Sequence, residues 1–521
     1  MRVLLLYPLF PKSFWSFERT LALVDCKALM PPLGLITVAA ILPQEWEFRL
    51  VDHNVQEITE SDWDWAELVI ISGMIVQKND MLAQIAEAKS RNKTVAVGGP
   101  YATTSPQEVE MADFLVLDEG EITLPMFIAA IERGDRSGVF RATEKPAVTE
   151  TPIPRYDLLD LTAYDNMSVQ FSRGCPFQCE FCDIIVLYGR KPRTKTPEQL
   201  LAELQTIYDL GWRGAVFMVD DNFIGNKRNV KLLLKELKVW MAERQYPFGL
   251  TTEASVDLAR DDELMQLMVE CNFKKVFLGI ETPDQDSLAL TSKFQNTRDP
   301  LTESINKITT AGMVVMAGFI IGFDGEKAKA GDRIVQFVEQ TNIPLAMFSM
   351  LQALPSTALW DRLEKEGRLL NGSANINQTT LMNFVPTRNI EDIATEYVNA
   401  FWKLYDPANY LKRVFRYYMM LGSAKNAKSL RPSWKTIRAL GLILWKQGVI
   451  AQTRFLFWKN LIQVIVKKPR QLEIYLTLCA YLEHFTEYRF IVREQINTQL
   501  ANYIASKPQA ETAETVKTIA S

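Results

Sequence analysis

The sequence predicts an α/β protein in three parts: a doubly wound parallel sheet, a partial barrel of six βα units, and a mainly helical C-terminal domain. Through residue 365, short apolar runs alternate with segments of helical spacing, and the strand signal disappears from about residue 366 onward. Continuous apolar runs between helices are typical of parallel strands buried on both faces. The expected bounds are 1–150, a linker at 151–165, a barrel at 166–365, a helical domain at 366–505, and a disordered tail at 506–521.

The first region contains five apolar runs with helical patterns such as "PPLGLITVAAIL" and "DMLAQIAEAKSRN" between them. Sheets of this kind bind ligands at the carboxyl ends of their strands. The expected strands are 2–7, 47–52, 68–72, 94–99 and 114–118.

The second region begins after "TPIPRYDLLDLTAYD", whose two prolines break the periodicity and suggest a linker. Six βα units in succession favour an incomplete barrel with its active loops at the strand C-termini. The expected strands are 167–172, 215–220, 249–254, 275–281, 314–322 and 345–351.

The composition is that of a soluble globular protein, with 48% apolar and 23% charged residues among 521. Six scattered cysteines do not form a disulfide framework, which favours a reducing compartment. The N-terminal apolar run lacks a signal-peptide cleavage site, and no run reaches the roughly 18 apolar residues of a membrane-spanning helix. We therefore expect a cytoplasmic protein.

Three of the cysteines lie within "SRGCPFQCEFCD", at Cys175, Cys179 and Cys182. Structural zinc, the alternative, needs four ligands, and catalytic zinc sites usually include histidine. The chain has two histidines, His53 and His484, both far away in sequence. Three thiolates and no fourth ligand suit an iron–sulfur cluster with one iron left open for a small molecule.

This Cys-x3-Cys-x2-Cys motif, with Phe181 before the last cysteine, resembles that of the radical S-adenosylmethionine enzymes. "FMVDDNF", "GIET" and "GFIIGFDGE" stand at later strand ends, where that family contacts S-adenosylmethionine. The glycines permit close backbone approach, and aspartates can accept from an ammonium group. The resemblance implies a 4Fe-4S cluster on the three cysteines and an S-adenosylmethionine site that includes Phe181, Asp220, Asp221, Glu281, Gly318, Ile320 and Gly322.

The first region resembles the cobalamin-binding domain of the class B radical methylases through "VDHN", "ISGM", "GGPYAT" and "DEGE". A nicotinamide site is disfavoured because no Gly-x-Gly-x-x-Gly turn follows the first strand. His53 directly follows Asp52 and does not match the family's histidine ligand, so we expect a loop histidine and a cobalt without a protein base; loss of cobalamin is an alternative. The implied cobalamin contacts are Asp52, Ser72, Gly73, Gly98, Gly99, Glu119 and Gly120.

Residues 401–470 carry fifteen lysines and arginines and one acidic residue, whereas the rest of the chain is acidic. Aromatic residues accompany these charges, which is typical of an interfacial helix on anionic lipid. A helical cap with solvated charges is the alternative. No recognised nucleic-acid module is present, so no nucleic-acid partner is expected.

Within the class B methylases the chain most resembles the hopanoid C-2 methylases, through "SRGCPFQCEFCDIIVLYGRKPRTKTPEQL" and "MVDDNFIGN". The resemblance implies methylation of an unactivated carbon of a membrane lipid, at the inner face of the membrane, with an external electron donor. A methylase or oxidative cyclase acting on a chlorophyll-type tetrapyrrole is an alternative. A cobalamin-sensing interaction module without turnover is an alternative of another class.

Overall fold

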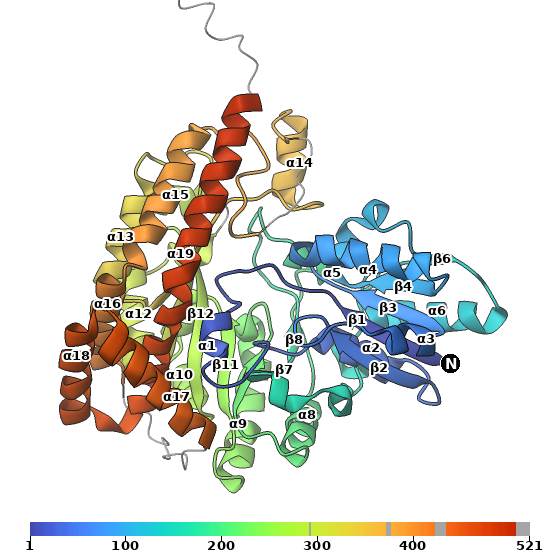
Figure 1. The fold of residues 1–521 in the computed structure, drawn as a ribbon, viewed down its shortest axis with the longest axis horizontal. Coiled ribbons are helices and arrows are strands. Elements are labelled where there is room, and N and C mark those ends of the chain that lie inside the picture. Colours follow the sequence, from blue (N-terminus) through green and yellow to red (C-terminus); the bar gives the residue numbers. More distant parts are fainter. Residues whose placement is uncertain (291–292, 371–376, 423–433, 507–521) are drawn as a thin grey trace, which may run out of the picture.

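The computed structural model describes residues 1–290, 293–370, 377–422 and 434–506 (Figure 1). The tail predicted to be disordered therefore lies outside the described residues, apart from Ser506. The N-terminal region, the barrel and the C-terminal helices follow one another across the molecule, from right to left in Figure 1.

The N-terminal region contains a six-stranded parallel sheet in the order β2-β1-β3-β4-β5-β6. Residues Val3–Leu6 of β1 are fully buried, as expected for a strand covered on both faces. Helices α2 (Leu33–Ile41) and α6 (Gly120–Arg133) pack on one face, and three others pack on the opposite face, so the sheet is doubly wound. The strands are β1 (Arg2–Tyr7), β2 (Glu47–Asp52), β3 (Leu68–Ser72), β4 (Thr94–Gly98), β5 (Phe114–Val116) and β6 (Gly138–Phe140), and the three other helices are α3 (Glu60–Trp65), α4 (Lys78–Ser90) and α5 (Gly99–Thr104).

The second region is an open six-stranded parallel sheet in the order β14-β13-β12-β11-β10-β7, with β14 and β7 at its edges. This confirms the partial barrel. Amphipathic helices cover its outer face, because each carries its apolar stripe toward the strands. The strands are β7 (Asn166–Val169), β10 (Ala215–Met218), β11 (Gly249–Ala254), β12 (Phe273–Glu281), β13 (Val314–Ile321) and β14 (Leu345–Met350), and the covering helices are α8 (Pro197–Asp209), α9 (Lys227–Glu243), α10 (Asp262–Glu270), α12 (Leu301–Ala311) and α13 (Ala330–Thr341). The short α11 (Gln285–Leu290) follows β12.

A two-stranded hairpin, β8 (Ser172–Arg173) with β9 (Arg193–Thr194), and the short α7 (Ile184–Leu187) frame the cysteine loop. The expected strand 167–172 is interrupted after Val169. The reason is that Asp220 accepts hydrogen bonds from the backbone amides of Phe171 and Ser172, which diverts the chain from the ladder. The neighbouring strand likewise ends at Met218 rather than at Asp220.

The C-terminal region is helical, as predicted, and the 35-residue helix α19 (Leu472–Ser506) runs along it (Figure 1). Helix α15 packs on α13 and β14, and α19 packs on α15 and α16. The other elements are α14 (Ala358–Lys365), α15 (Ile390–Leu404), α16 (Pro407–Met420), α17 (Trp434–Trp445), the π-helical turn η9 (Lys446–Ile450) and α18 (Arg454–Lys467). Among the described residues, we find no helix whose length and apolar character would let it cross a bilayer.

The chain between β1 and α2 leaves its own domain and crosses to the C-terminal helices. We call residues 9–24, which include the short helix α1 (Glu18–Leu21), the N-terminal arm. Phe14 packs against Phe401, Tyr405 and Phe485, and α1 lies beside α19 (Figure 1). The arm therefore joins the first and last parts of the chain.

The basic segment 401–470 does not form one charged surface. Arg413 is fully buried and donates to the carbonyl oxygens of Ile343 and Leu404 while pairing with Glu339. Lys468 points inward to the carbonyl oxygens of Tyr418 and Leu421, and burial lowers its pKa. Part of the positive charge thus serves as hydrogen-bond donors within the C-terminal region.

Candidate active site

The cysteine loop follows β8 and is held tightly against its own return segment. Gly174 has a φ of +92°, and a Cβ there would lie 2.8 Å from the carbonyl oxygen of Gly189. The backbone amide of Cys175 donates to that same oxygen at 3.2 Å, and the amide of Cys182 donates to the carbonyl oxygen of Cys179 at 3.2 Å. Glycine is required at position 174 for this close approach.

The three thiols lie close enough for their charges to act on one another. Burial raises the pKa of Cys175, of Cys179 and of Cys182, and the charge of a neighbouring cysteine adds to the effect for Cys175 and Cys182. Amide donors approach two of the sulfurs at 3.9 Å, Asn222 Nδ2 at Cys175 and Gln295 Nε2 at Cys179. Such donors stabilise charge on cluster-bound sulfur, and metal binding would displace the thiol protons.

Within the described residues, no group of three or more His, Cys, Asp or Glu is arranged to hold a single metal ion. A four-iron cluster sets a different requirement, because each cysteine binds a different iron. The three buried or half-buried cysteines, two of them with an amide donor at the sulfur, fit that cluster.

Asp220 and Asp221 follow β10 and leave carboxylate oxygens without partners. Asp220 Oδ1 accepts from the amides of Phe171 (2.8 Å) and Ser172 (2.9 Å), whereas Oδ2 of Asp220 and Oδ2 of Asp221 have no hydrogen bond among the described residues. Burial raises the pKa of both side chains to about 7, and for Asp221 the charge of Asp220 contributes. Buried carboxylates without partners are costly unless a ligand pairs with them.

Two further carboxylates share this interior. Burial, followed by the charges of Asp221, Glu281 and Asp220, raises the pKa of Glu253 to about 8. Glu281 ends β12 and is paired with Lys293. Among the described residues, only Glu281 of these four carboxylates has an ion-pair partner, so the group favours a cationic ligand. The sequence analysis did not predict Glu253 and Lys293 as site residues. The alternation along the predicted strand could have indicated Glu253, because it places this side chain on the face opposite to the buried residues.

The other residues of the predicted S-adenosylmethionine site lie at the same ends of β12 and β13. Phe181 is half-buried, with its ring 5.8 Å from that of Phe323 and 5.9 Å from Lys293 Nζ. Gly322 has a φ of +100°, and its amide donates to Glu326 at 2.9 Å. Burial raises the pKa of Glu326 to about 7.

Gly318 lies one layer deeper in the barrel. A Cβ at this position would lie 2.8 Å from the ring of Phe277, so a side chain would displace that ring. Ile320 is half-buried on the same strand. The structure thus brings the cysteine loop, the carboxylates and the strand ends to one edge of the barrel.

A row of half-buried apolar side chains lies next to this charged edge. Phe277, Ile320 and Met347 occupy alternate positions on β12, β13 and β14. Trp15 of the N-terminal arm covers the row, with its ring 5.7 Å from Phe277 and its Nε1 3.1 Å from Met347 Sδ. We call Trp15, Phe277, Ile320 and Met347 the apolar wall.

The residues predicted to contact cobalamin lie at the carboxyl ends of the first sheet. Ser72 and Gly98 are paired at the ends of β3 and β4, and the amide of Tyr101 donates to the carbonyl oxygen of Gly73 at 3.2 Å. Gly99 has a φ of +86°, and a Cβ there would lie 2.4 Å from Ser72 Oγ. These residues form a small-residue cradle at the position where such sheets bind ligands.

Asp52 and Glu119 have their carboxylates engaged by protein groups. Asp52 accepts from Asn54 Nδ2 at 2.7 Å and from the hydroxyl of Tyr164 at 3.0 Å. Glu119 pairs with Arg173 at 2.9 Å and with Arg193 at 2.7 Å, both on the hairpin that frames the cysteine loop. Glu119 therefore links the first domain to the cysteine loop, while the next residue, Gly120, begins α6.

His53 does not present a free ring nitrogen to a ligand. Its Nδ1 lies 3.0 Å from Asp80 and its Nε2 lies 2.9 Å from Glu57. Burial alone would lower the pKa of His53, but the hydrogen bonds and charges of these two carboxylates outweigh it and the pKa is raised. This agrees with the expectation of a loop histidine.

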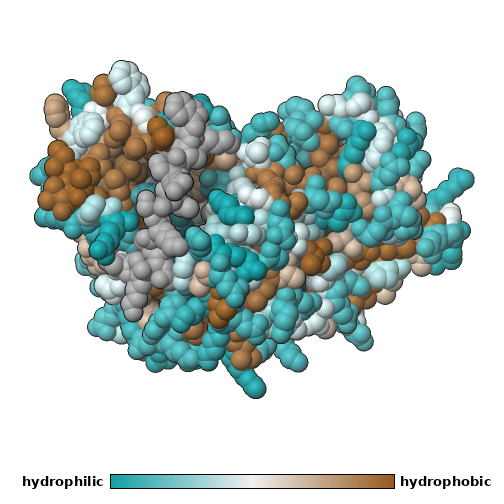
Figure 2. Space-filling model, turned by 90° about the horizontal axis from the view of Figure 1, so that it is seen from below, coloured by the Kyte–Doolittle hydropathy of each residue, from teal (hydrophilic) through white to brown (hydrophobic). Residues whose placement is uncertain are grey.

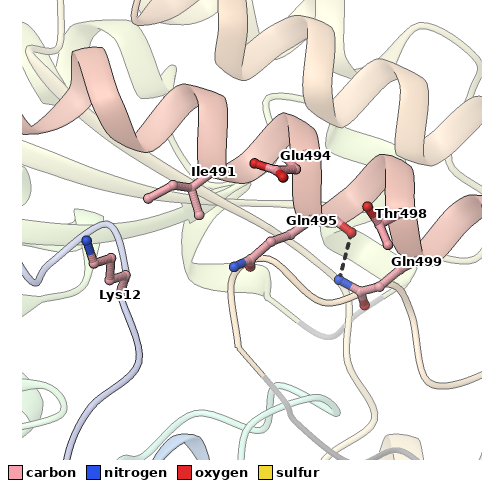
Figure 3. Close-up of a pocket in the computed structure, with 6 residues that line it drawn as sticks. All are labelled: Lys12, Ile491, Glu494, Gln495, Thr498 and Gln499. Atoms are coloured by element: carbon pink, nitrogen blue, oxygen red, sulfur yellow. Dashed lines mark hydrogen bonds between the residues drawn. The ribbon is translucent and has the colours of Figure 1, made fainter.

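Figure 3 shows a hollow between the N-terminal arm and α19, bounded by Lys12 on one side and by α19 residues from Ile491 to Gln499 on the other. The amide of Gln499 donates to the carbonyl oxygen of Gln495 at 3.1 Å within it. The hollow contains none of the predicted site residues, so we place the active site at the barrel edge instead.

Profiles of known families match three successive parts of the chain. The radical SAM superfamily profile matches residues 169–338, the B12 binding domain profile matches residues 19–128, and a domain of unknown function (DUF4070) matches residues 357–498. In fold, the chain is similar to the radical S-adenosylmethionine methyltransferase TsrM from Kitasatospora setae, solved with cobalamin and a 4Fe-4S cluster bound. The TM-score is 0.60 at 16% identity, over 84% of this chain and 95% of that one.

Two relatives match nearly the whole chain. An uncharacterized methyltransferase of Synechocystis sp. is 65% identical over 99% of this chain and 97% of its own length. The hopanoid C-2 methylase of Rhodopseudomonas palustris is 36% identical over 89% of this chain and 90% of its own length. With its B12-binding and radical domains, the protein belongs to the cobalamin-dependent radical S-adenosylmethionine methyltransferase family, whose cofactors are a 4Fe-4S cluster, S-adenosylmethionine and cobalamin.

Proposed function

We propose that this methyltransferase methylates an unactivated carbon of a hopanoid, at C-2. The observation that carries the proposal is the apolar wall, which lies directly beside the carboxylates of the barrel edge. A polycyclic hydrocarbon needs such a wall because it offers little for polar side chains to bind. The similarity to a hopanoid C-2 methylase over most of both chains supports the same acceptor.

We assign the cluster to Cys175, Cys179 and Cys182. The unpaired oxygens of Asp220 and Asp221 would accept from the ammonium group of S-adenosylmethionine, and Glu281 and Glu253 would hold the positive charge of this ligand nearby. The remaining proposed contacts, which line the rest of this ligand's site, are Phe181, Gly318, Ile320 and Gly322.

Cobalamin would rest on the small-residue cradle of the first sheet, at Ser72, Gly73, Gly98, Gly99 and Gly120. Asp52 would shape the cradle through Tyr164, and Glu119 would position the cysteine loop through Arg173 and Arg193. When bound, the cluster and S-adenosylmethionine supply a radical that removes a hydrogen atom, and cobalamin supplies the methyl group. The protein side chains then orient the acceptor and exclude water.

The proposal includes two partners and a location. Radical enzymes of this family need a reductant, and we propose an external electron donor. We also propose that the protein works in the cytoplasm, in peripheral contact with the inner face of a membrane that holds the acceptor.

The test is production of the chain in a hopanoid-producing bacterium that lacks C-2 methylation, followed by mass spectrometry of the lipids. Methylated hopanoids should appear with the wild-type chain and should be absent with Cys179→Ala. Cys271→Ala is the matched control, because Cys271 is buried against α9 rather than placed in the cysteine loop.

Each other outcome contradicts part of the proposal. Methylated or cyclised chlorin pigments without methylated hopanoids would assign a tetrapyrrole acceptor. Reconstituted protein that binds cobalamin but never cleaves S-adenosylmethionine under reducing conditions would point to a sensing module.

A further inference from the structure

Helix α18 is apolar on two opposite faces. One face packs into the protein through Phe457, Leu461 and Val464. The other face is exposed, and its side chains recur at steps of three or four, which places them on one stripe. Their exposed fractions are 76% for Phe455, 39% for Trp458, 57% for Ile462, 48% for Ile465 and 75% for Val466.

The exposed stripe continues onto η9 and α17. Trp458 Nε1 donates to the carbonyl oxygen of Gly448 at 2.8 Å, which fixes the π-helical turn against α18. Trp445, Val449 and Ile450 are 57%, 48% and 62% exposed on this turn and just before it. Figure 2 shows hydrophobic atoms gathered at the left end of the molecule, the end that α18 occupies in Figure 1. We call Trp445, Val449, Ile450, Phe455, Trp458, Ile462, Ile465 and Val466 the outer apolar face.

The charged residues within the segment that forms the outer apolar face have one sign, and the acidic partners Asp25 and Glu483 come from other parts of the chain. Residues 434–470 contain eight lysines and arginines and no acidic residue. Four of these cations are exposed and have no ion-pair partner within the described parts of the chain: Arg454, Lys459, Lys467 and Arg470.

On another exposed helix of the same protein, the lysines beside the exposed apolar side chains have ion-pair partners. Helix α9 also exposes Leu232 and Val239, but there the neighbouring lysines are paired, as Lys231 is with Glu263 and Lys238 is with Glu270. Isolated apolar side chains among paired charges are ordinary surface, whereas a contiguous apolar face with unpaired cations marks an interaction surface.

We propose that α17, η9 and α18 dock this protein on an anionic bilayer, with the outer apolar face at the headgroup–acyl boundary and the four unpaired cations on lipid phosphates. Aromatic and aliphatic side chains beside lysine and arginine are the chemistry of an interfacial helix. A second copy of the chain is a poorer occupant, because a two-fold contact would oppose the same cations to themselves. Docking through this face depends on its exposed side chains and not on which methyl acceptor the active site takes.

The test is flotation of the reconstituted full chain with vesicles of phosphatidylglycerol and phosphatidylcholine, and with phosphatidylcholine alone. Neither vesicle contains hopanoid, so the result does not depend on the acceptor. Binding should require the anionic lipid and weaken as salt screens the charges. Lys459→Glu, Lys467→Glu and Arg470→Glu together should weaken it at least about 100-fold, at roughly 1 kcal/mol for each cation near the surface.

A second variant tests insertion. Phe455→Ser, Ile462→Ser and Val466→Ser together should abolish flotation at moderate salt, whereas the matched control, Leu232→Ser with Val239→Ser on α9, should bind as wild type does. Brominated lipid should quench tryptophan fluorescence in the wild type, and Trp445→Phe, at a 57% exposed position, should lose part of that quenching without any change in thermal unfolding.

Absence of flotation at low salt, or binding that charge reversal leaves unchanged, would overturn the docking proposal. Loss of a dimer in the serine variant, measured by light scattering, with flotation intact would assign the face to a second copy instead. Hopanoid methylation in detergent is tested separately and can succeed or fail in either case.

Discussion

Asp220→Asn should make the ligand-free protein more stable at alkaline pH while weakening S-adenosylmethionine binding. Burial raises the pKa of Asp220 from 3.8 to about 7, so the folded state holds a proton that the unfolded chain releases. Stability from this group is therefore present at acid pH and is lost as the pH rises from about 4 to about 7. From these values, the free energy of unfolding of the wild-type protein falls by about 2–3 kcal/mol between about pH 5 and about pH 8 because of Asp220 alone.

The asparagine removes this pH dependence and keeps the local geometry. Its amide oxygen can still accept from the amides of Phe171 and Ser172, as Oδ1 of Asp220 does. Its nitrogen then stands where Oδ2 has no partner, which costs about 1–3 kcal/mol. Ionised Asp220 costs about 4 kcal/mol at about pH 8, so we expect a net gain of about 1–3 kcal/mol there and no gain at about pH 5.

Urea unfolding of the wild type and Asp220→Asn at the two pH values measures this difference. Asp64→Asn on the exposed surface of α3 is the control and should shift neither value. Calorimetry on anaerobically reconstituted protein should show S-adenosylmethionine binding reduced roughly 10- to 100-fold, the loss of one charge-assisted hydrogen bond. If Asp220→Asn changed the free energy of unfolding equally at both pH values, a buried charge at Asp220 would be refuted. If the variant bound S-adenosylmethionine as tightly as the wild type, the contact between Asp220 and the ammonium group would be refuted.

Three further outcomes follow from single residues. Cys175→Ala, Cys179→Ala or Cys182→Ala should each abolish the cluster, measured as iron and sulfide content after reconstitution; full iron occupancy in any of them would exclude its thiolate as a ligand. His53→Ala should leave the cobalt spectrum unchanged, because both ring nitrogens already face carboxylates, and a nitrogen ligand lost in that variant would contradict this. Burial lowers the pKa of His484 from 6.5 to about 4, so its stabilisation is present above about pH 6.5 and is lost as the pH falls toward about 4. His484→Gln, which keeps a donor for the carbonyl oxygen of Ser13, should flatten the stability profile by about 2 kcal/mol between about pH 8 and about pH 5. An unaltered profile would show that the pKa of His484 is the same in the folded and unfolded states.

Short stretches of the sequence are enough to predict most of the strands and helices. The strands of both parallel sheets follow from apolar runs that alternate with amphipathic helices, except β6, a short edge strand that is not buried and was not predicted. The cysteine motif is also local, because its spacing sets three thiolates on one tight loop. The glycine before Cys175 also indicates the left-handed backbone conformation found at position 174.

The contacts that only the tertiary structure decided join residues far apart in the chain. Trp15 contacts Met347, and Glu119 pairs with Arg173. The hydrophobic periodicity of one segment cannot predict which distant residue its side chains will contact. Lys468 shows the same limit: its neighbours in sequence predict a surface cation, yet the packing of α16 turns its ammonium group inward. The sequence shows Glu253 only as a strand residue, whereas its raised pKa depends on three carboxylates from neighbouring strands and their loops. A strand pattern specifies which face a side chain takes, whereas the charge of that face depends on which strands become neighbours.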